Sequence, residues 1–149
     1  MTNQKLTVKH MEILYYSKTI KYSFPLTQNI RWLTVYDYEV FCGHLKLCGQ
    51  RIISKRKWKE IYAEGTVYCG LFVDDKMVSR ACVEKYSSNA WEVADVRTAT
   101  EHRGNGYACQ GCCFVLNYIL SQGKTATIRT EEDNSNMKKI IAKLGFSAL

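Results

Sequence analysis

The chain has 149 residues, of which 46% are hydrophobic and 23% are charged, with one proline, nine glycines and a formal net charge of +7. This length fits about one domain, and the composition excludes disordered, collagen-like and low-complexity proteins. No stretch approaches the roughly 18 apolar residues of a membrane span, and the first residues lack the apolar core of a secretory signal. We therefore expect a single domain over 1–149 in the cytoplasm, with no membrane partner.

The first half of the sequence predicts strands followed by two short helices. The expected elements are strands over 5–16, 18–24 and 30–35, a helix from an Asp37 cap to about Leu47, and a helix over 55–63 between a Ser54 cap and Gly65. We treat residues 1–29 as an N-terminal extension and 30–146 as the core.

Most of the excess positive charge lies in this half, since residues 1–85 hold 14 Lys and Arg against 8 Asp and Glu. The densest basic cluster consists of Arg51, Lys55, Arg56, Lys57 and Lys59, beside Trp58. A basic surface with an aromatic side chain could follow a nucleic-acid backbone. A solvated helix face explains the same charges without any sequence-reading element, so we expect no nucleic-acid partner.

The second half predicts an antiparallel meander followed by alternating helices and strands. The expected elements are strands over 66–73, 76–86 and 90–98, a helix over 106–120 ended by Gly123, a strand over 125–130, and an amphipathic helix over 134–144 ended by Gly145. The order indicates an α/β fold with a mixed central sheet flanked by helices.

Three of the seven cysteines lie in the helix expected at 106–120, namely Cys109, Cys112 and Cys113. Their C-x-x-C spacing occurs in metal sites, but a second pair of ligands is missing. The odd number and irregular spacing do not fit a disulfide framework. We interpret them as reduced thiols that fill a core, and we expect no metal site.

A glycine-containing loop joins the strand at 90–98 to that helix, with the sequence Thr100-Glu101-His102-Arg103-Gly104-Asn105-Gly106-Tyr107-Ala108. Glycines let backbone N–H groups turn toward a ligand, and the following helix N-terminus attracts a phosphate. A dinucleotide-binding loop would need glycine where Cys109 stands, and the P-loop-like Gly123-Lys124-Thr125 leads from helix to strand, the reverse of the required order.

The remaining pattern, Arg103-x-x-Gly106-x-Ala108, resembles the Q/R-x-x-G-x-G/A signature of the GNAT superfamily of acyl-CoA-dependent N-acetyltransferases. A second block, from Asn134 to Leu144-Gly145-Phe146, is similar to the family's asparagine-initiated helix that ends on Leu-Gly-Phe. The order and spacing of both motifs strengthen the resemblance, which covers roughly residues 30–146. It implies a GNAT-type α/β fold and transfer of an acetyl group from acetyl-CoA to a primary amine.

The resemblance also implies where the cofactor, acetyl-CoA, would bind. The backbone of Val96, Arg97 and Thr98 would pair with the pantetheine arm, as an added strand. The pyrophosphate would lie on the loop residues Arg103, Gly104, Asn105, Gly106, Tyr107 and Ala108. Asn134 would contact the pantetheine or the phosphates, although its position equally predicts a simple helix N-cap.

Glu92 is the catalytic candidate, because some family members place a general base eleven residues before the Q/R-x-x-G motif. Strict strand alternation predicts that Glu92 shares a face with Ala94, Val96 and Thr98 and that Asp95 points the other way. There its carboxylate could take a proton from the acceptor ammonium through water. A strand carboxylate that merely pairs with a basic residue is the alternative.

Two departures from the family pattern affect these expectations. Ile141 stands where many members have a tyrosine that protonates the leaving thiolate, and isoleucine cannot donate a proton. The family sheet usually continues beyond Phe146, so we expect a sheet that is short at its C-terminal end and must have its open edge covered. Either residues 6–24 cover it within the chain, or a homodimer does so; the sequence slightly favours the homodimer.

The acceptor is a small-molecule or peptide amine that the sequence does not identify. Two other functions stay open, a non-catalytic acyl-CoA sensor and, less in keeping with the charge pattern, a basic nucleic-acid-binding module. Turnover with an amine separates the first from an enzyme, and a steep salt dependence of nucleic-acid binding would mark the second.

Overall fold

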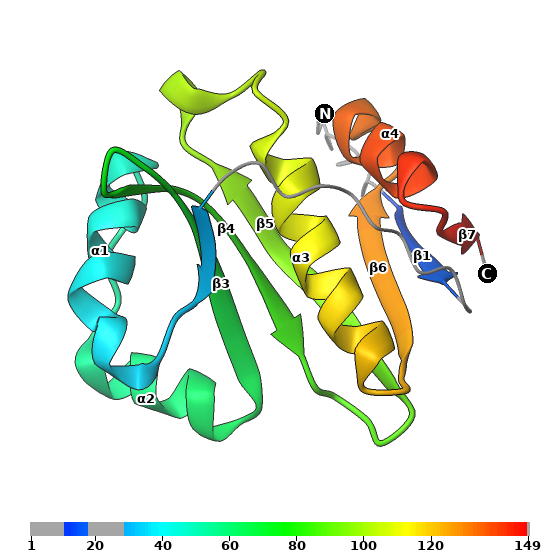
Figure 1. Ribbon diagram of the computed structural model, residues 1–149, viewed down its shortest axis with the longest axis horizontal. Coiled ribbons are helices and arrows are strands. Elements are labelled where there is room, and N and C mark those ends of the chain that lie inside the picture. Colours follow the sequence, from blue (N-terminus) through cyan, green and yellow to red (C-terminus); the bar gives the residue numbers. More distant parts are fainter. Residues whose placement is uncertain (1–10, 18–28, 149) are drawn as a thin grey trace, which may run out of the picture.

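A mixed α/β sheet flanked by helices, as the sequence predicts, is confirmed. This computed structural model describes residues 11–17 and 29–148, in which seven strands form one sheet in the order β2-β3-β4-β5-β6-β1-β7 (Figure 1). The strands are β1 (Glu12–Ser17), β2 (Asn29–Trp32), β3 (Thr66–Val73), β4 (Lys76–Glu84), β5 (Ala90–Thr98), β6 (Thr125–Glu131) and β7 (Ser147–Ala148). The helices are α1 (Tyr38–Leu47), α2 (Lys55–Ala63), α3 (Tyr107–Ser121) and α4 (Ser135–Lys143), with 3-10 turns at Val35–Asp37 and Thr100–His102. Only the β5–β6 pair is parallel among the pairs of described strands.

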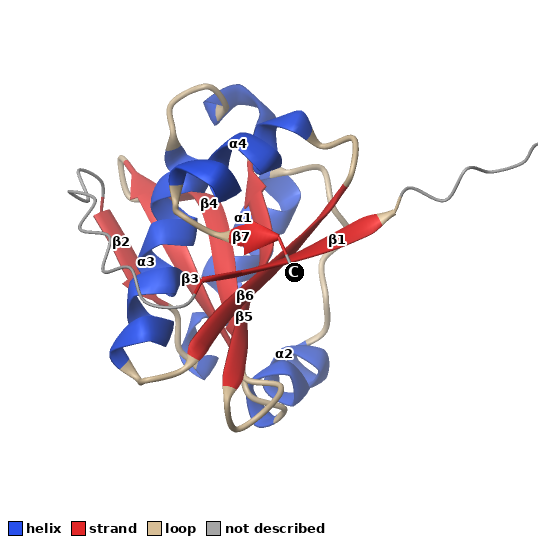
Figure 2. Cartoon of the chain, turned by 90° about the vertical axis from the view of Figure 1, so that its right-hand side faces the viewer, coloured by secondary structure: helices blue, strands red, loops and turns tan. Residues whose placement is uncertain are grey.

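The helices cover the two faces of the sheet, α3 and α4 on one and α1 and α2 on the other (Figure 2). Cys112 and Cys113 of α3 are completely buried in the core between α3 and the sheet, called the α3 core below. The interpretation of these two residues as small hydrophobic side chains is confirmed. The core between the sheet and helices α1 and α2, called the α1/α2 core below, is rich in aromatic rings, with Phe41 and Trp58 tilted by 31° at 4.5 Å between ring centroids. Each face of the sheet therefore has its own apolar cluster.

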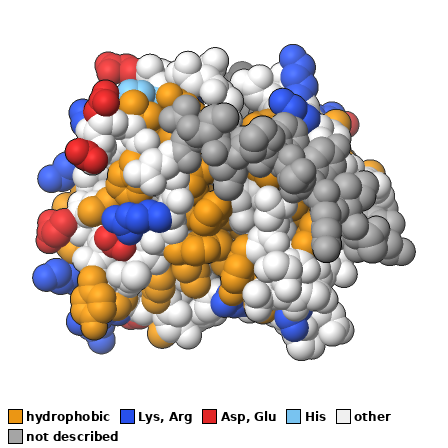
Figure 3. Space-filling view, viewed as in Figure 1, with side chains coloured by type: hydrophobic (Ala, Val, Ile, Leu, Met, Phe, Trp, Pro, Cys, Tyr) orange, Lys and Arg blue, Asp and Glu red, His pale blue; other side chains and the backbone are white. Residues whose placement is uncertain are grey.

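Hydrophobic side chains also gather on the surface beside α3 (Figure 3). Trp32 of the edge strand β2 lies with its ring 5.0 Å from the rings of both Phe114 and Tyr118 of α3. These contacts join the edge strand to the central helix and leave the aromatic rings partly exposed.

The N-terminal strand β1 covers the edge of β6 from within the chain. Its residues Glu12–Ser17 pair antiparallel with β6, and the two-residue β7 then pairs with the other edge of β1 at Tyr15 and Tyr16. The in-chain alternative therefore accounts for the edge, and a homodimer is not needed for that purpose. The other expected strand residues, 5–10 and 18–24, lie outside the described part of the chain.

The expected strand at 30–35 ends early, at Trp32, because a capping box begins at Thr34. The Asp37 carboxylate accepts from the Thr34 backbone N–H at 2.7 Å and forms an ion pair with Arg31 at 3.0 Å. Asp37 is the N-cap residue of α1, as expected, but its side chain makes no capping hydrogen bond to that helix. The short polar side chain stabilises the preceding turn instead.

Strand β5 departs from both of its neighbours near its middle. Its parallel pairing with β6 ends at Val93 and Ile128, although β5 continues to Thr98 and β6 to Glu131, and the strands diverge there (Figure 1). On the β4 side, Asp95 and Val96 together occupy the place opposite Ala81, which is a β-bulge. Asp95 adopts a left-handed backbone conformation, with φ of 46°.

The bulge corrects the expected orientation of the β5 side chains. Ala94 packs on the α1/α2 core, and Asp95 hydrogen-bonds Tyr68 of that same core, whereas Val96 packs against the α3 core. The expectation that Glu92, Ala94 and Val96 share a face, with Asp95 opposite, is therefore wrong. Strict alternation fails because the extra residue shifts every later side chain to the other face.

Candidate active site

A groove of about 530 Å³ lies where β5 and β6 diverge. Its residues come from the end of β5, the following loop with the start of α3, and the start of α4: Val96, Arg97, Thr98, His102, Arg103, Gly104, Gly106, Tyr107, Ala108, Cys109, Asn134, Asn136, Met137, Lys139 and Ile140. An adjoining cavity of about 310 Å³ shares Val96, Asn134 and Met137 and extends between the strands toward Arg129. The structure thus brings together both blocks that carry the family resemblance.

The loop before α3 presents unpaired backbone donors to this groove. Gly104 and Gly106 have left-handed φ angles of 83° and 79°, which glycine adopts without strain. Within the described part of the chain, the N–H groups of residues 104–108 donate to no other protein atom. The first N–H groups of an α-helix carry partial positive charge, so this loop and helix start have the donors and the charge that an anion site uses.

Basic side chains add to this positive potential. Arg97, Arg103 and Lys139 line the groove, and no described carboxylate lines it. The Arg103 Nε donates to the Thr98 carbonyl at 3.2 Å, which ties the loop to the end of β5. A guanidinium has five N–H donors in all, so this bond leaves Arg103 able to bind an anion as well.

The end of β5 offers an open strand edge inside the groove. From Ala94 to Thr98, the side of β5 that faces β6 has no strand partner among the residues described here. Backbone N–H and C=O groups need hydrogen-bond partners, so this edge can pair with an extended chain that carries amides. The expected binding positions Val96, Arg97 and Thr98 all lie on it.

Asn134 lies at the N-terminus of α4, where it lines both the groove and the adjoining cavity. Its Oδ1 accepts from the Met137 backbone N–H at 3.0 Å, so the N-cap expected for this residue is confirmed. The two donors of the side-chain amide bind no described atom. Capping and a contact to a ligand are therefore compatible.

Glu92 is buried, with 6% of its surface exposed, and its carboxylate pairs with Arg129 of β6. The Arg129 Nε donates to Oε1 and Oε2 at 3.3 and 3.2 Å, and Nη2 donates to Oε1 at 3.3 Å. The hydrogen bonds and charge of Glu92 raise the pKa of Arg129. Glu92 lines neither the groove nor the adjoining cavity, whereas its partner Arg129 lines the adjoining cavity. The ion pair matches the pairing alternative, and Arg129 lies between the carboxylate and that cavity.

Sequence reasoning missed a second carboxylate near the groove, that of Asp95. It accepts from Arg80 at 3.0 and 3.2 Å and from the Tyr68 hydroxyl at 2.5 Å. Burial alone would raise the pKa of Asp95, but the hydrogen bonds and charge of Arg80 outweigh it and lower the pKa. No local signal announces this site, because its partners come from β3 and β4.

Ile141 and the basic cluster, two features singled out in the sequence, do not line the groove. Ile141 is buried in the α3 core with 1% exposed, so it faces no leaving group. In the basic cluster, all five cationic side chains are exposed on or next to α2, whereas Trp58 is buried and donates to the Val35 carbonyl. The cluster is a solvated helix face, and the aromatic ring expected to act with it, Trp58, is not at the surface.

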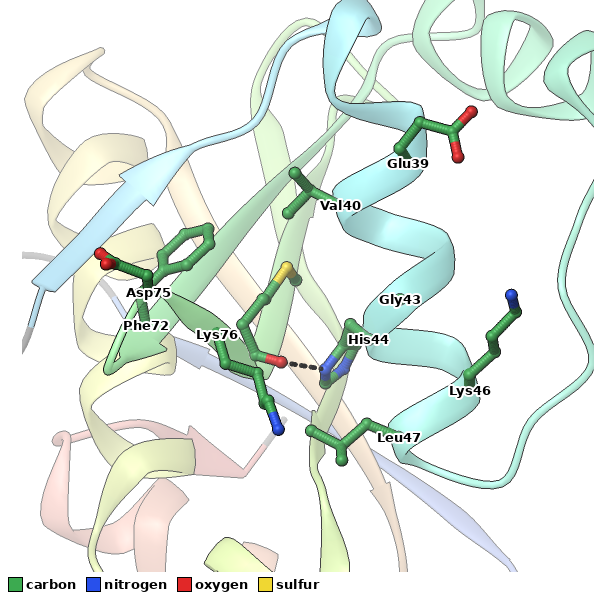
Figure 4. Close-up of a pocket in the computed structure, with 10 residues that line it drawn as sticks. Glu39, Val40, Gly43, His44, Lys46, Leu47, Phe72, Asp75 and Lys76 are labelled. Atoms are coloured by element: carbon green, nitrogen blue, oxygen red, sulfur yellow. Dashed lines mark hydrogen bonds between the residues drawn. The ribbon is translucent and has the colours of Figure 1, made fainter.

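A separate cavity of about 540 Å³ lies between α1 and the β3–β4 turn and shares no residue with the groove (Figure 4). His44 on its wall is 1% exposed, and its Nδ1 donates to the Met77 carbonyl at 3.2 Å. Burial, together with the charge of Arg80, lowers the pKa of His44 to about 4. This histidine is therefore neutral near pH 7 and supports the contact between α1 and β4.

Comparison with known structures shows the same fold in acetyltransferases. One is a GNAT-family acetyltransferase from Colwellia psychrerythraea, with a TM-score of 0.72 and 17% identity over 92% of this chain and 52% of that protein. Another is AAC(6')-Iy in complex with the bisubstrate analogue CoA-S-monomethyl-acetylneamine, with a TM-score of 0.66 and 18% identity over 80% of this chain and 90% of that one. A third is the ribosomal-protein-S18-alanine N-acetyltransferase from Escherichia coli, with a TM-score of 0.65 and 12% identity over 80% and 77% of the two chains. This chain thus spans about half the length of the Colwellia protein.

Other comparisons bear on the membrane and on the family. No helix in the described part of the chain has the length and apolar character to cross a membrane. No curated protein has a sequence that matches this one significantly. The family model of the acetyltransferase (GNAT) domain, however, matches residues 30–147, most of the chain. The chain therefore belongs to the GNAT acetyltransferase family.

Proposed function

We propose that this protein transfers an acetyl group from acetyl-CoA to a primary amine. The observation that carries the proposal is the groove itself, in which free loop N–H groups and an unpaired strand edge lie side by side. These two features suit the two parts of the cofactor, a pyrophosphate and an arm that carries amides. A groove for either part alone would not need both.

In the proposed complex, the pyrophosphate lies on the N–H groups of residues 104–108, with Arg103 as a cation beside it. The pantetheine arm pairs with the open edge of β5 along Val96, Arg97 and Thr98, and the Asn134 side-chain amide donates to the arm or the phosphates. When bound, acetyl-CoA supplies an acetyl thioester, and the pairing would direct that thioester into the gap between β5 and β6.

The chemistry is a direct displacement. The neutral amine nitrogen attacks the thioester carbonyl carbon, a backbone N–H of β5 donates to the developing oxyanion, and the carbon–sulfur bond then breaks. The amine loses one proton, and coenzyme A leaves as a thiolate. Because Ile141 stands where many members have a proton-donating tyrosine, this position supplies no proton to the thiolate.

Glu92 is our candidate for accepting the amine proton through water. Its position beside the adjoining cavity, next to Arg129, supports this role. The ion pair opposes it, because both carboxylate oxygens already accept hydrogen bonds from Arg129. Glu92 therefore has to act through a water that reaches it past Arg129.

The acceptor is a small-molecule or peptide amine. Structural neighbours include an aminoglycoside acetyltransferase with bound sisomicin and a ribosomal-protein-alanine N-acetyltransferase, so both kinds of acceptor occur among proteins of this fold. All seven cysteines are free thiols, which supports a reducing compartment such as the cytoplasm.

The test is an amine panel with acetyl-CoA and detection of the released thiol. The panel should include aminoglycosides, polyamines and peptides with free N-termini, and each amine needs a control without protein. Amine-dependent thiol release supports an enzyme. Tight coenzyme A binding without release from any amine would instead support a non-catalytic binding domain.

A further inference from the structure

The β5 bulge holds a strained residue in the middle of a strand. Three non-glycine residues among those described have positive φ, namely Asp74, Asp75 and Asp95. Asp74 and Asp75 form the two-residue turn between β3 and β4, where a hairpin requires this conformation. No turn requires it at Asp95, so the surrounding contacts must hold this residue in place.

Those contacts form a clamp, which we define as Asp95, Arg80, Tyr68 and Gln50. Arg80 binds the carboxylate with two of its nitrogens, and its third nitrogen donates to Gln50 in the α1–α2 loop at 2.8 Å. The Tyr68 hydroxyl donates to Oδ2 of the same carboxylate. Arg80 is only 4% exposed, so the guanidinium has few other ways to satisfy its donors.

The location of the clamp connects it to the groove. Pairing between β5 and β6 ends two residues before Asp95, and Val96, the next residue, lines both the groove and the adjoining cavity. The clamp therefore fixes the backbone of β5 where its open edge begins. A one-residue slip at the bulge would turn every later N–H and C=O of that edge.

We propose that Asp95 is a positioning residue: the clamp of Asp95, Arg80, Tyr68 and Gln50 holds the β5 bulge so that the open edge of β5 fits the pantetheine arm of acetyl-CoA. This inference rests on the proposed function. Asp95 lines the adjoining cavity, and the role proposed for it is to act through the backbone of Val96 to Thr98. The pyrophosphate loop begins beyond Thr98. A hydrogen bond from Arg103 to the Thr98 carbonyl ties it to the strand, but its anion donors, the N–H groups of residues 104–108, lie beyond that bond.

The test compares two ligands by calorimetry, coenzyme A and 3′-phosphoadenosine 5′-diphosphate, which keeps the pyrophosphate and lacks pantetheine. Asp95→Gly relieves the backbone strain and removes the clamp, and Asp95→Asn tolerates the left-handed conformation but loses the charge. Both variants should bind coenzyme A about tenfold more weakly, because misplaced groups lose contacts along the whole arm, and bind the nucleotide as the wild type does.

Asp75→Gly is the matched control, since it changes an aspartate of similar φ that lies outside the groove, and it should bind both ligands normally. The proposed role of the clamp would be refuted if Asp95→Gly bound coenzyme A with wild-type affinity, or if it lost affinity equally for both ligands. If the Asp95 variants fail to fold, Tyr68→Phe provides a second test, because it removes one clamp hydrogen bond and keeps the ring. It should lower the affinity for coenzyme A by about threefold and leave the affinity for the nucleotide unchanged. An unchanged affinity for coenzyme A would also refute the proposal.

These outcomes separate the clamp from the activity. A wild-type protein that binds coenzyme A and acetylates no amine overturns the proposed activity and leaves the ligand comparison valid. A wild-type protein that binds neither ligand overturns both.

Discussion

Replacement of Gly106 by valine tests the phosphate loop against a control on the same helix. Gly106 has φ of 79° and begins α3, and Gly123 has φ of 73° and follows the end of that helix. A Cβ atom at either position would meet no heavy atom within 4 Å. In the ligand-free protein, both variants therefore suffer similar backbone strain, and the Cβ atom clashes at neither position.

The strain of a left-handed residue with a side chain is about 2 kcal/mol. In a domain of this size, that loss lowers the melting temperature by roughly 4–8 °C, and we expect this for Gly106→Val and Gly123→Val alike. Gly106 lines the groove and Gly123 does not. Only Gly106→Val should also place its branched side chain against the pyrophosphate, with a loss of at least about tenfold in coenzyme A affinity, which is 1.4 kcal/mol.

Thermal unfolding gives the first quantity, and titration calorimetry with coenzyme A gives the second. Two results would refute the reasoning. Equal coenzyme A affinity in the two variants would show that the phosphates bind elsewhere. A much larger stability loss at Gly106 than at Gly123 would show that the loop is packed and not open.

Three further changes test other parts of the structure. Glu92→Gln should lower turnover, most at low pH where the amine is protonated, with nearly unchanged coenzyme A affinity; a pH profile equal to that of the wild type would exclude Glu92 as the base. Because the pKa of His44 falls from 6.5 to about 4 on folding, the unfolded chain binds the extra proton, so the free energy of unfolding should drop as pH falls from 6.5 toward 4, by about 3 kcal/mol in all. Denaturation of His44→Gln should lack this part of the slope, and an identical slope would contradict the assignment. Gly111→Ala should stabilise the protein by about 1 kcal/mol, because its Cβ would lie in ordinary contact 3.6 Å from that of Ala81. Gly70→Ala should destabilise the protein, because its Cβ would lie 2.8 Å from the buried Met77 sulfur. A lower melting temperature for Gly111→Ala than for Gly70→Ala would contradict the packing of α3 on β4 described here.

Local chemistry explains why the groove-forming segments could be predicted. The glycines of the loop, the Asn134 cap and the apolar face of α3 act on residues within a few positions of themselves. The sequence therefore predicted the strand–loop–helix unit and the final helix with bounds close to those of the structure. The mixed sheet followed from the order of these elements.

Contacts between distant segments explain what could not be predicted. The β5 bulge depends on Arg80 and Tyr68, two residues of other strands, so alternation along β5 alone placed Asp95 and Val96 on the wrong faces. The pairing of β1 with β6 joins segments far apart in the chain. The sequence therefore left in-chain pairing and a homodimer both open, and it slightly favoured the homodimer, which the edge does not need. The residues of one strand do not by themselves determine which other strand pairs with it.

The most direct measurement of the central claim is a titration of the wild-type protein with coenzyme A, followed by both calorimetry and thermal unfolding. We expect saturable binding of one coenzyme A per chain. At a ligand concentration of 100 times Kd, binding to the folded state adds about 2.7 kcal/mol of stability, which should raise the melting temperature by roughly 5–10 °C. No heat of binding and no thermal shift at millimolar coenzyme A would contradict the assignment of the groove between β5 and β6 as the cofactor site.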